Sequence, residues 1–440
     1  MGEPTVDPRK KIRSLPVGTE VEITPPDGRT WHGIIVPSTE FSGENIVVLK
    51  LASGYNVGLA ITERDVLTVI AKPRRTRATK SAASTPGLAA PALPSTPWVA
   101  LLTTGGTIAS RVDYQTGGVK PVSDEREILA AFPALDADGP VHVVPVFERF
   151  SEDIVPADWI ALAEKIGECF RQGARGVVIA HGTDTMGFTA AALSFMVGNP
   201  PGPVVLVGAQ RSPDRPSSDG FTNLPAAIHL ARSGELGEVV VVMHDGISDD
   251  RWAVHRGTRV RKMHSSRRDA FESRNAPPIG YIEGKRIELG AEARRPSGAP
   301  LQIETHLDER VALVTYYPGL SPLRLRRFVR NERGLVIAGT GLGHVSRTHL
   351  RGLRRLIEGG LVVGMTTQCL EGGTDPYVYS TGRDLVRAGV VYLDDLLPET
   401  AYAKMLWALG QSEDPERVRA LLLEDQVGEF VTRRRLEAAR

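Results

Sequence analysis

The 440-residue sequence predicts an α/β protein: two domains built on parallel sheets, preceded by a small β-barrel module. Three observations support this prediction. Residues 17–71 alternate apolar and polar positions between glycine and proline turns. A segment rich in Pro, Ala, Ser and Thr follows. Beyond Trp98, fully apolar strands alternate with stretches of helical spacing, which is typical of parallel sheets covered on both faces.

The N-terminal module, residues 1–71, contains five expected strands. VEITP, WHGIIVP, NIVVLKL, YNVGLAI and VLTVI each suit a short strand, and turn residues separate them. Five short strands in one compact segment favour an SH3-like barrel. Residues 72–97 have neither a helical nor a strand period, so we expect a flexible linker. The basic start of this linker leaves contact with RNA phosphates open as an alternative.

Two α/β domains are expected after the linker. Residues 98–284 contain the apolar strands VALLTTGG, GVVIAHGTDT, VVLVGAQR and EVVVVMHDG, with helical spacing in residues 157–173. Residues 285–309 are polar and irregular, and we expect them to connect the two domains. Residues 310–440 repeat the pattern with RVALVTYYPG, GLVIAGTGLGH and GLVVGMTTQC, which predicts the second domain.

Composition excludes several functional classes. The net charge of +1 argues against a global basic field for nucleic acid. No apolar run is long enough to span a membrane, and the N-terminus lacks the apolar core of a signal peptide. Two distant cysteines indicate a reducing compartment, so we expect a cytoplasmic protein. The Cys and His spacings match no zinc pattern, GTGLGH is only a fragment of a dinucleotide fingerprint, and no Gly-Lys-Ser/Thr phosphate loop is present. We therefore expect no cofactor in this chain.

Polar residues follow two of the predicted parallel strands, where ligands of such sheets usually bind. Thr107 follows the Gly105-Gly106 turn. Four polar residues, His181, Thr183, Asp184 and Thr185, lie within the five residues that follow GVVIA. Thr107 is a candidate catalytic hydroxyl or a capping residue of the turn. A hydroxyl beside a carboxylate makes Thr183 and Asp184 a candidate nucleophile or substrate-binding pair, although Asp184 as a helix N-cap remains an alternative.

A threonine hydroxyl needs a base to become a nucleophile. Lys262 is the candidate, because it lies among Arg259, Arg261, Arg267 and Arg268, and like charges favour a neutral lysine. Alternatively, the whole run is an electropositive face that binds RNA or a partner.

The segments TTGGTIAS and AHGTDTM, in this order, resemble the two signatures of the bacterial-type asparaginase/glutaminase family. The resemblance implies that a threonine hydroxyl attacks the side-chain amide of Asn or Gln, that ammonia leaves, and that water hydrolyses the acyl-enzyme. Thr107 matches the first-signature nucleophile. Thr183, Asp184 and Lys262 match a Thr–Lys–Asp relay. Which threonine attacks stays open.

The same resemblance implies substrate-binding residues. Tyr114 matches a mobile-loop tyrosine that helps to activate the first threonine. Ser151 and Glu152 lie where the family binds the α-carboxylate and α-amine of the substrate, although simple asparaginases commonly have Gln at the second position. Backbone N–H groups near Thr107 or in the loop 182–184 are the expected donors to the oxyanion.

Further segments resemble the D subunits of archaeal-type glutamyl-tRNA(Gln) amidotransferases, over residues 17–430: VVLKLASGYNVGLAI, VHRGTRVRKMHSSRRDAF, TTQCLEG and VYSTGRDLVRAGVV. The resemblance implies that this chain hydrolyses L-glutamine and passes ammonia to a partner, the amidotransferase E subunit. That partner would bind glutamyl-tRNA(Gln) and hold ATP and Mg²⁺. It further implies at least a homodimer, as part of a heterotetramer, with the barrel and residues 257–268 near the partner or the tRNA.

Two other functions remain open at this point. Residues 372–382 depart from the family pattern where the active site is completed, so the preference for Gln over Asn is not fixed. The chain is alternatively a stand-alone L-asparaginase with an accessory N-terminal domain. A catalytically dead scaffold that only binds RNA is the third hypothesis, against which the complete set of Thr107, Thr183, Asp184 and Lys262 argues.

Overall fold

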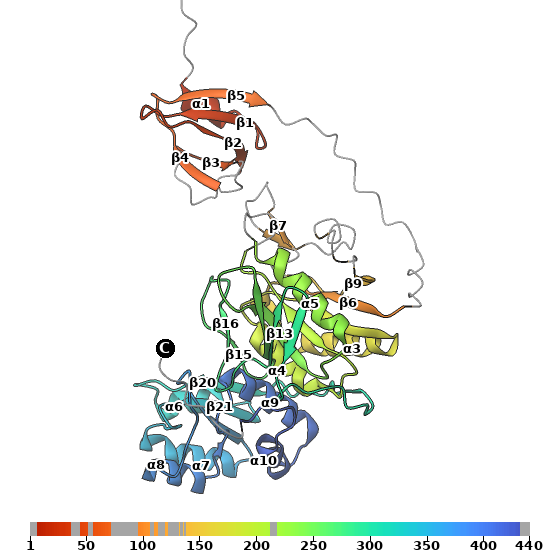
Figure 1. Ribbon diagram of the computed structural model, residues 1–440. Coiled ribbons are helices and arrows are strands. Elements are labelled where there is room, and N and C mark those ends of the chain that lie inside the picture. The colour runs from red at the N-terminus through yellow and green to blue at the C-terminus, as the bar shows by residue number, and fades with distance from the viewer. Residues whose placement is uncertain are drawn as a thin grey trace, which may run out of the picture. The chain divides into compact units, whose positions relative to one another are not determined.

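The computed structural model shows two compact units, which we describe separately (Figure 1). One centres on the N-terminal sheet and the other holds both α/β domains. The structure describes residues 7–36, 45–51, 56–71, 96–105, 110–112, 119–121, 132, 135, 138–211 and 218–431. Among these residues, no helix combines the length and the apolar character needed to cross a membrane.

The N-terminal module is a five-stranded antiparallel sheet in the order β4-β3-β2-β1-β5, and it contains the five predicted strands. Alternate residues point inward, as Val21, Ile23 and Leu49 do, and form a small core of their own. A short helix that the strand pattern does not predict, α1, starts at Pro8, where Asp7 accepts a hydrogen bond from the backbone N–H of Arg9. The elements are α1 (Pro8–Arg13), β1 (Glu20–Thr24), β2 (Trp31–Val36), β3 (Ile46–Leu51), β4 (Asn56–Ala60) and β5 (Val66–Ala71). A separate two-stranded sheet joins β7 (Ser110–Val112) and β8 (Val119–Pro121).

The first α/β domain contains an eight-stranded sheet in the order β18-β17-β14-β13-β12-β10-β6-β9. The predicted parallel sheet is present in β6 (Trp98–Thr103), β9 (Val141–Pro145), β10 (Ala174–Ala180), β12 (Val204–Val207) and β13 (Val239–His244). Three antiparallel strands make the sheet mixed: β14 (Arg251–Arg256), β17 (Gly280–Glu283) and β18 (Arg286–Leu289). A short connection joins β13 to β14, and such a connection cannot form the long crossover that a parallel pair requires.

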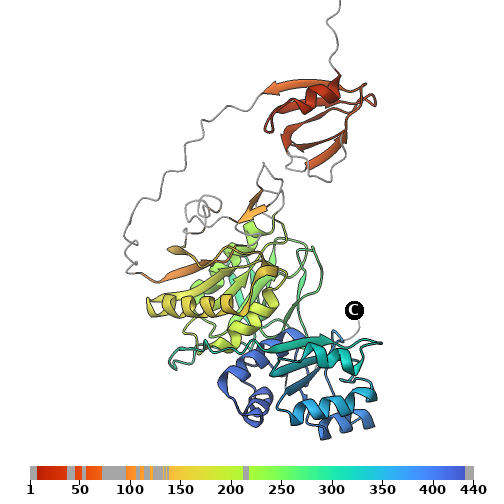
Figure 2. The same ribbon diagram turned by 180° about the vertical axis from the view of Figure 1, so that it is seen from behind.

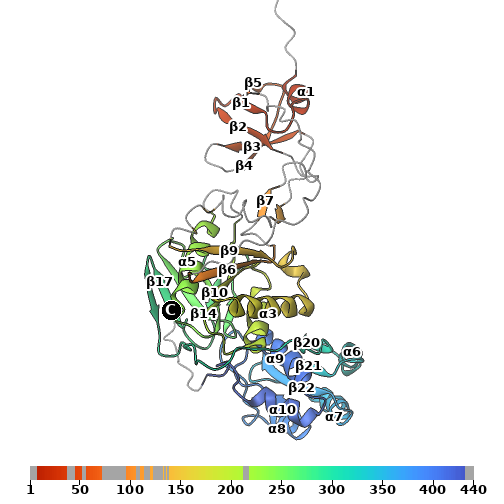
Figure 3. The same ribbon diagram turned by 90° about the vertical axis from the view of Figure 1, so that its right-hand side faces the viewer.

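Helices cover both faces of this sheet. Helices α3 (Pro156–Arg171) and α4 (Met186–Met196) pack on one face, and α5 (Gly220–Ser233) packs on the other (Figure 3). Every residue of β6 is buried, as expected for an interior strand with two covered faces. Smaller elements complete the domain: η2 (Ser151–Asp153), β11 (Val197–Gly198) paired with β19 (Gln302–Ile303), and β15 (Val260–Lys262) paired with β16 (Phe271–Ser273).

The second α/β domain has four parallel strands in the order β20-β21-β22-β23. Helices α6 and α7 lie on one face, and α9 lies on the other (Figure 3). The predicted two-domain α/β class is thereby confirmed. The elements are β20 (Val311–Thr315), α6 (Pro322–Phe328), β21 (Gly334–Gly339), η3 (Arg347–His349), α7 (Leu350–Glu358), β22 (Val362–Thr367), α8 (Ser380–Arg387), β23 (Val391–Tyr392), α9 (Pro398–Gln411) and α10 (Pro415–Leu423).

The two α/β domains are held together by packing and by a buried ion pair. Helix α4 of the first domain packs against α9 of the second (Figure 2). At this contact the rings of Phe195 and Trp407 stack, with their centroids 5.8 Å apart. The guanidinium of Arg259 binds both carboxylate oxygens of Asp395, at 2.8 and 3.2 Å, and both side chains are buried. Thr400 adds a hydrogen bond from its hydroxyl to the backbone carbonyl of Thr258 at 2.7 Å.

A second buried ion pair fastens the segment after α10. The Nζ atom of Lys404 on α9 lies 2.6 Å from Oε1 of Glu429, and both side chains are fully buried. Lys404 also donates to the backbone carbonyls of Leu422 and Glu424, and Glu429 accepts the backbone N–H of Val427. Burial penalises the charged forms, so it lowers the pKa of Lys404 and raises the pKa of Glu429.

We expect Lys404→Met to destabilise the protein by about 3–5 kcal/mol, because it leaves a buried carboxylate without a counter-charge. Thermal and denaturant unfolding of the full chain measure this loss. K404M/E429Q should recover part of it, since the second change removes the uncompensated charge. Lys285→Met, at an exposed lysine, is the control and should change stability by less than about 0.5 kcal/mol. A K404M protein as stable as K285M would contradict the prediction.

Candidate active site

Four of the predicted site residues follow the carboxyl ends of parallel strands. Thr183 and Asp184 lie three and four residues after the end of β10, while Ser151 and Glu152 lie in η2, which follows β9. Thr185 links the two segments, because its hydroxyl donates to the backbone carbonyl of Ser151 at 2.6 Å. A Cβ atom on Gly182 would lie only 2.8 Å from Cβ of Ser151, so this close approach requires glycine.

Lys262, at the end of β15, contacts both residues of the predicted relay. Its Nζ atom lies 2.8 Å from Oγ1 of Thr183 and 2.7 Å from Oδ1 of Asp184. Thr183 is buried, the Lys262 side chain is 13% exposed and the Asp184 side chain is 67% exposed. The buried hydroxyl of Thr183 therefore contacts the amine of Lys262, and the exposed carboxylate of Asp184 holds this amine in place. The fold thus brings Lys262 into one cluster with the adjacent residues Thr183 and Asp184, although 78 residues separate Lys262 from Asp184 in the sequence.

The structure contradicts the interpretation of Asp184 as a helix N-cap. Helix α4 begins at Met186, its N-cap is Thr185, and no side chain caps it. The carboxylate of Asp184 binds Lys262 instead. This placement removes the structural alternative to a role at the site.

The arginines around Lys262 do not form an open cationic face. Each has a carboxylate partner: Arg259 with Asp395, Arg261 with Glu399, Arg267 with Asp269 and Arg268 with Asp249. Paired guanidinium groups exert little net repulsion on a neighbouring lysine. The sequence argument from like charges therefore loses its physical basis here, and so does the electropositive-face alternative for residues 257–268.

The predicted substrate-binding residues are placed only in part. Ser151 is buried beside Gly182, and its hydroxyl lies 3.4 Å from Oε2 of the exposed Glu152. The serine and glutamate therefore lie on the rim of the Thr183 cluster. Thr107 and Tyr114 lie outside the described residues.

A buried hydrogen-bond chain supports the catalytic loop, and the sequence motifs do not reveal it. Nδ1 of His181 lies 2.6 Å from the carbonyl oxygen of Gly182, which can only accept, so Nδ1 carries the proton. Nε2 must then accept from the hydroxyl of Thr189 at 2.9 Å, and Thr189 accepts the indole N–H of Trp159 at 3.0 Å. This chain fixes the orientation of the Gly182 peptide, directly before Thr183. The only sequence signal is a histidine inside the motif and a threonine eight residues later.

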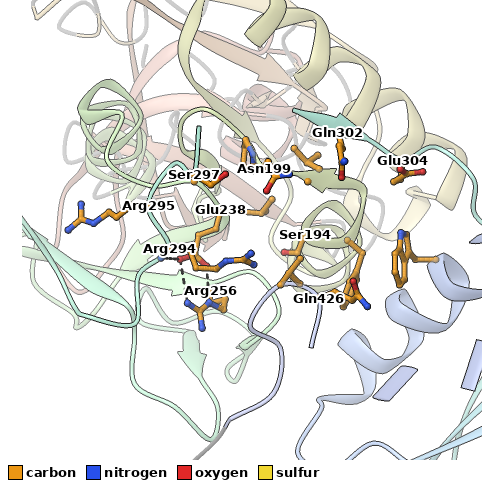
Figure 4. A pocket seen from close by; sticks show the side chains of 18 of the residues that line it. Ser194, Asn199, Glu238, Arg256, Arg294, Arg295, Ser297, Gln302, Glu304 and Gln426 are labelled. Atoms are coloured by element: carbon orange, nitrogen blue, oxygen red, sulfur yellow. Dashed lines mark hydrogen bonds and ion pairs between the residues drawn. The ribbon is translucent and has the colours of Figure 1, made fainter. Parts of the chain in front are cut away.

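A separate pocket lies elsewhere, at the amino end of β13 (Figure 4). Its volume is about 300 Å³, and it contains none of the predicted site residues. The guanidinium of Arg256 binds the buried carboxylate of Glu238 there, at 2.8 Å. The charges of this pair satisfy each other, and the predicted relay lies elsewhere, so we assign the chemistry to the Thr183 cluster.

No group of three or more His, Cys, Asp or Glu side chains in the described parts of the chain could hold a metal ion. The sequence expectation that this chain carries no cofactor remains a prediction.

Comparison with known families gives three matches. Residues 98–295 match "Asparaginase, N-terminal", residues 310–422 match "Glutaminase/Asparaginase C-terminal domain" and residues 15–70 match "GatD N-terminal domain". Curated D subunits of glutamyl-tRNA(Gln) amidotransferases are similar over nearly their full length. The Pyrococcus abyssi protein is 44% identical and covers 97% of each chain, and the Pyrobaculum aerophilum protein is 44% identical and covers 91% of this chain and 94% of its own.

The chain belongs to the family of glutamyl-tRNA(Gln) amidotransferase D subunits. It is an enzyme component with an asparaginase-type amidohydrolase fold. Among solved structures, the thermostable L-asparaginase from Thermococcus kodakarensis is 34% identical, with a TM-score of 0.70, and covers 76% of this chain and 100% of its own. L-asparaginase I from Vibrio cholerae is 30% identical, with a TM-score of 0.67, and covers 76% and 99%. The D-subunit relatives thus extend over more of this chain than the asparaginases do.

We expect Thr189→Val to destabilise this D-subunit family member by about 1–3 kcal/mol, because it leaves buried His181 and Trp159 atoms without partners. Thr189→Ser is the matched control, since it keeps the hydroxyl, and should lose much less. Unfolding midpoints of the two variants measure the difference. Equal stability of the two would show that the hydroxyl contributes nothing.

Stability should also fall as the pH falls from about 6.5 to about 4. Burial lowers the pKa of His181 and of His255 to about 4, whereas an unfolded histidine titrates near 6.5. Between these values the unfolded chain binds more protons, so the contribution of each histidine is complete above pH 6.5 and is lost towards pH 4. His255→Gln should reduce this pH dependence by up to about 1.4 kcal/mol per pH unit. Unfolding of wild type and H255Q at pH 7, 5.5 and 4.5 tests this, and parallel curves would refute it.

Proposed function

We propose that this chain is the glutaminase subunit of a tRNA-dependent amidotransferase. It hydrolyses L-glutamine through a threonine nucleophile and an acyl-enzyme, and it supplies ammonia that converts glutamyl-tRNA(Gln) to glutaminyl-tRNA(Gln) on the E subunit. The observation that carries this proposal is the contact of Lys262 with both Thr183 and Asp184, inside a D-subunit family fold. We further propose a cytoplasmic location, where aminoacylated tRNA is used.

The first chemical step requires a deprotonated hydroxyl. Lys262 in its neutral form accepts the proton of the Thr183 hydroxyl, and Asp184 holds the amine in position through its carboxylate. The threonine oxygen, of Thr183 or of Thr107, attacks the amide carbon of glutamine. The proton passes to the departing nitrogen, ammonia leaves, and an ester to the threonine remains. Water then attacks the ester and releases glutamate.

The attack places negative charge on the amide oxygen, and backbone N–H groups are its natural partners. In the described part of the chain, the N–H groups of residues 182–184 have no hydrogen-bond acceptor. The His181–Thr189–Trp159 chain holds this loop rigid. Both features support the loop as a preorganised oxyanion donor, and a ligand would satisfy groups that the protein leaves unpaired.

Free ammonia is protonated in water and ceases to be a nucleophile, so transfer to a second site requires a path that excludes water. We therefore propose that a partner subunit, which carries ATP and Mg²⁺, receives the ammonia within a stable complex. In this complex the chain forms at least a homodimer, as part of a heterotetramer. The names of the curated relatives support the tRNA-linked reaction. Ser151 and Glu152, on the rim of the cluster, are the proposed contacts for the charged groups of the glutamine backbone.

A stand-alone L-asparaginase is the second candidate, because the solved asparaginases match along their entire length. It predicts full amide hydrolysis without a partner, with Asn at least as good a substrate as Gln. Ammonia release from both amino acids, with and without the E subunit and glutamyl-tRNA(Gln), separates the two functions. Strong stimulation by the complex supports the amidotransferase.

We expect Thr183→Ala and Lys262→Met each to lower the rate of ammonia release from glutamine by about 10³-fold or more, since groups that act as a unit fail together. T183A/K262M should be no slower than either single variant. Thr183→Ser, which keeps a hydroxyl, is the control and should retain part of the activity. Undiminished ammonia release by T183A would refute the proposed relay.

A further inference from the structure

The outer helices of the C-terminal domain carry a dense group of arginines. Residues 321–333, which include α6, hold five arginines and one glutamate, and residues 347–358, which include α7, hold four arginines and one glutamate. The formal charge of the whole chain is only +1. Eight of these arginines are exposed, and Arg347 donates to the hydroxyls of Ser380 and Thr381. We define the α6–α7 arginine surface by the other seven: Arg324, Arg326, Arg327, Arg330, Arg351, Arg354 and Arg355.

These seven arginines form a group without counter-charges, whereas several other exposed arginines of the protein are paired. Arg295 pairs with Glu235 at 2.7 Å, and Arg417 pairs with Glu424 at 3.2 Å. None of the seven arginines forms an ion pair with a carboxylate in the described parts of the chain. The surface therefore has positive charge that the folded chain itself does not neutralise.

The fold directs these side chains to solvent on one side of the domain. Helices α6 and α7 lie on the same face of the four-stranded sheet, with Leu325 and Leu353 packed into a shared core (Figure 3). Arg330, two residues after α6, and Arg355 on α7 line the same hollow of about 430 Å³. The two groups of arginines therefore lie close to each other at that end. The exposed side chains of Leu323 and Phe328 lie on the same helix as the first arginines.

The spacing of the arginines costs stability in the isolated chain. Arg351 is three and four residues from Arg354 and Arg355, and on a helix such positions are neighbours. Like charges in this arrangement repel each other. A polyanion laid across both helices would remove that repulsion, whereas a small anion would neutralise only one or two of the seven charges.

We propose that the α6–α7 arginine surface binds the phosphate backbone of the tRNA substrate while the complex carries out transfer, an inference that rests on the proposed function. Guanidinium groups form paired hydrogen bonds with phosphate oxygens, and a nucleic acid supplies a charge at every nucleotide along a helix-sized surface. Exposed Phe328 adds a ring on which an unstacked base can lie. An acidic protein would need a row of carboxylates that matches the arginines, whereas RNA of any sequence presents a regular row of phosphates. The observations therefore favour RNA.

The test measures binding of fluorescent glutamyl-tRNA(Gln) to the assembled complex with the E subunit, between 50 and 200 mM salt. The variant R351Q/R354Q/R355Q removes three charges from the surface. R286Q/R295Q/R417Q is the matched control, since it removes three charges from ion pairs elsewhere. We expect the surface variant to raise the Kd about tenfold or more and to reduce the slope of log K against log salt by roughly 2 to 3. The control should change neither.

Glutamine hydrolysis without tRNA separates this proposal from the proposed function. Hydrolysis should be unchanged in the surface variant, because α7 lies outside the Thr183 cluster. Equal tRNA affinity and equal slope in the two triple variants would overturn the surface proposal and leave the glutaminase intact. Loss of the E subunit from the variant with unchanged tRNA binding would also overturn it, because the surface would then contact protein. A wild-type complex that releases no ammonia from glutamine would overturn the proposed function, whatever the tRNA affinities.

Discussion

The buried ion pair between Arg259 and Asp395 is the constraint on which the site depends. Arg259 lies three residues before Lys262, at the start of the β15–β16 hairpin, and Asp395 belongs to the other domain. Both charges are out of water, so removing either partner would leave the other uncompensated. The pair therefore ties the strand that carries Lys262, which belongs to the first α/β domain, to the second α/β domain. The contact of Lys262 with Thr183 consequently depends on the relative position of those domains.

Much of the site could be predicted because the chemistry follows from topology. Polar residues that follow apolar strands lie at one edge of a parallel sheet, and Thr183, Asp184 and Ser151 can be found by that rule or by family signatures. Lys262 can be found only through the resemblance to the family. It is 79 residues from Thr183 in the sequence, and nothing in its spacing shows that a short hairpin places it beside Thr183. The argument from neighbouring arginines names the right residue for a reason that the structure does not support.

Pairing between distant residues accounts for what the sequence does not reveal. The partners of Arg259 and Arg261 lie more than 130 residues away, so a basic run looks unpaired in the sequence although it is paired in the fold. Conversely, the arginines of the α6–α7 arginine surface look like ordinary solvated residues in the sequence. What distinguishes them is that seven arginines without carboxylate partners among the described residues lie together on one face of the domain. The His181–Thr189–Trp159 chain escapes prediction for the same reason, because tautomers are fixed by neighbours in space.

The Lys404–Glu429 pair has a practical consequence for anyone who shortens this chain. The matched asparaginase C-terminal domain ends at residue 422, which makes that position an obvious place to cut. A protein trimmed there would keep the buried ammonium on α9 and discard both Glu429 and the Glu424 carbonyl that receives it. Expression boundaries chosen from the family match alone would thus remove a segment that contributes a buried charge to the interior of the domain.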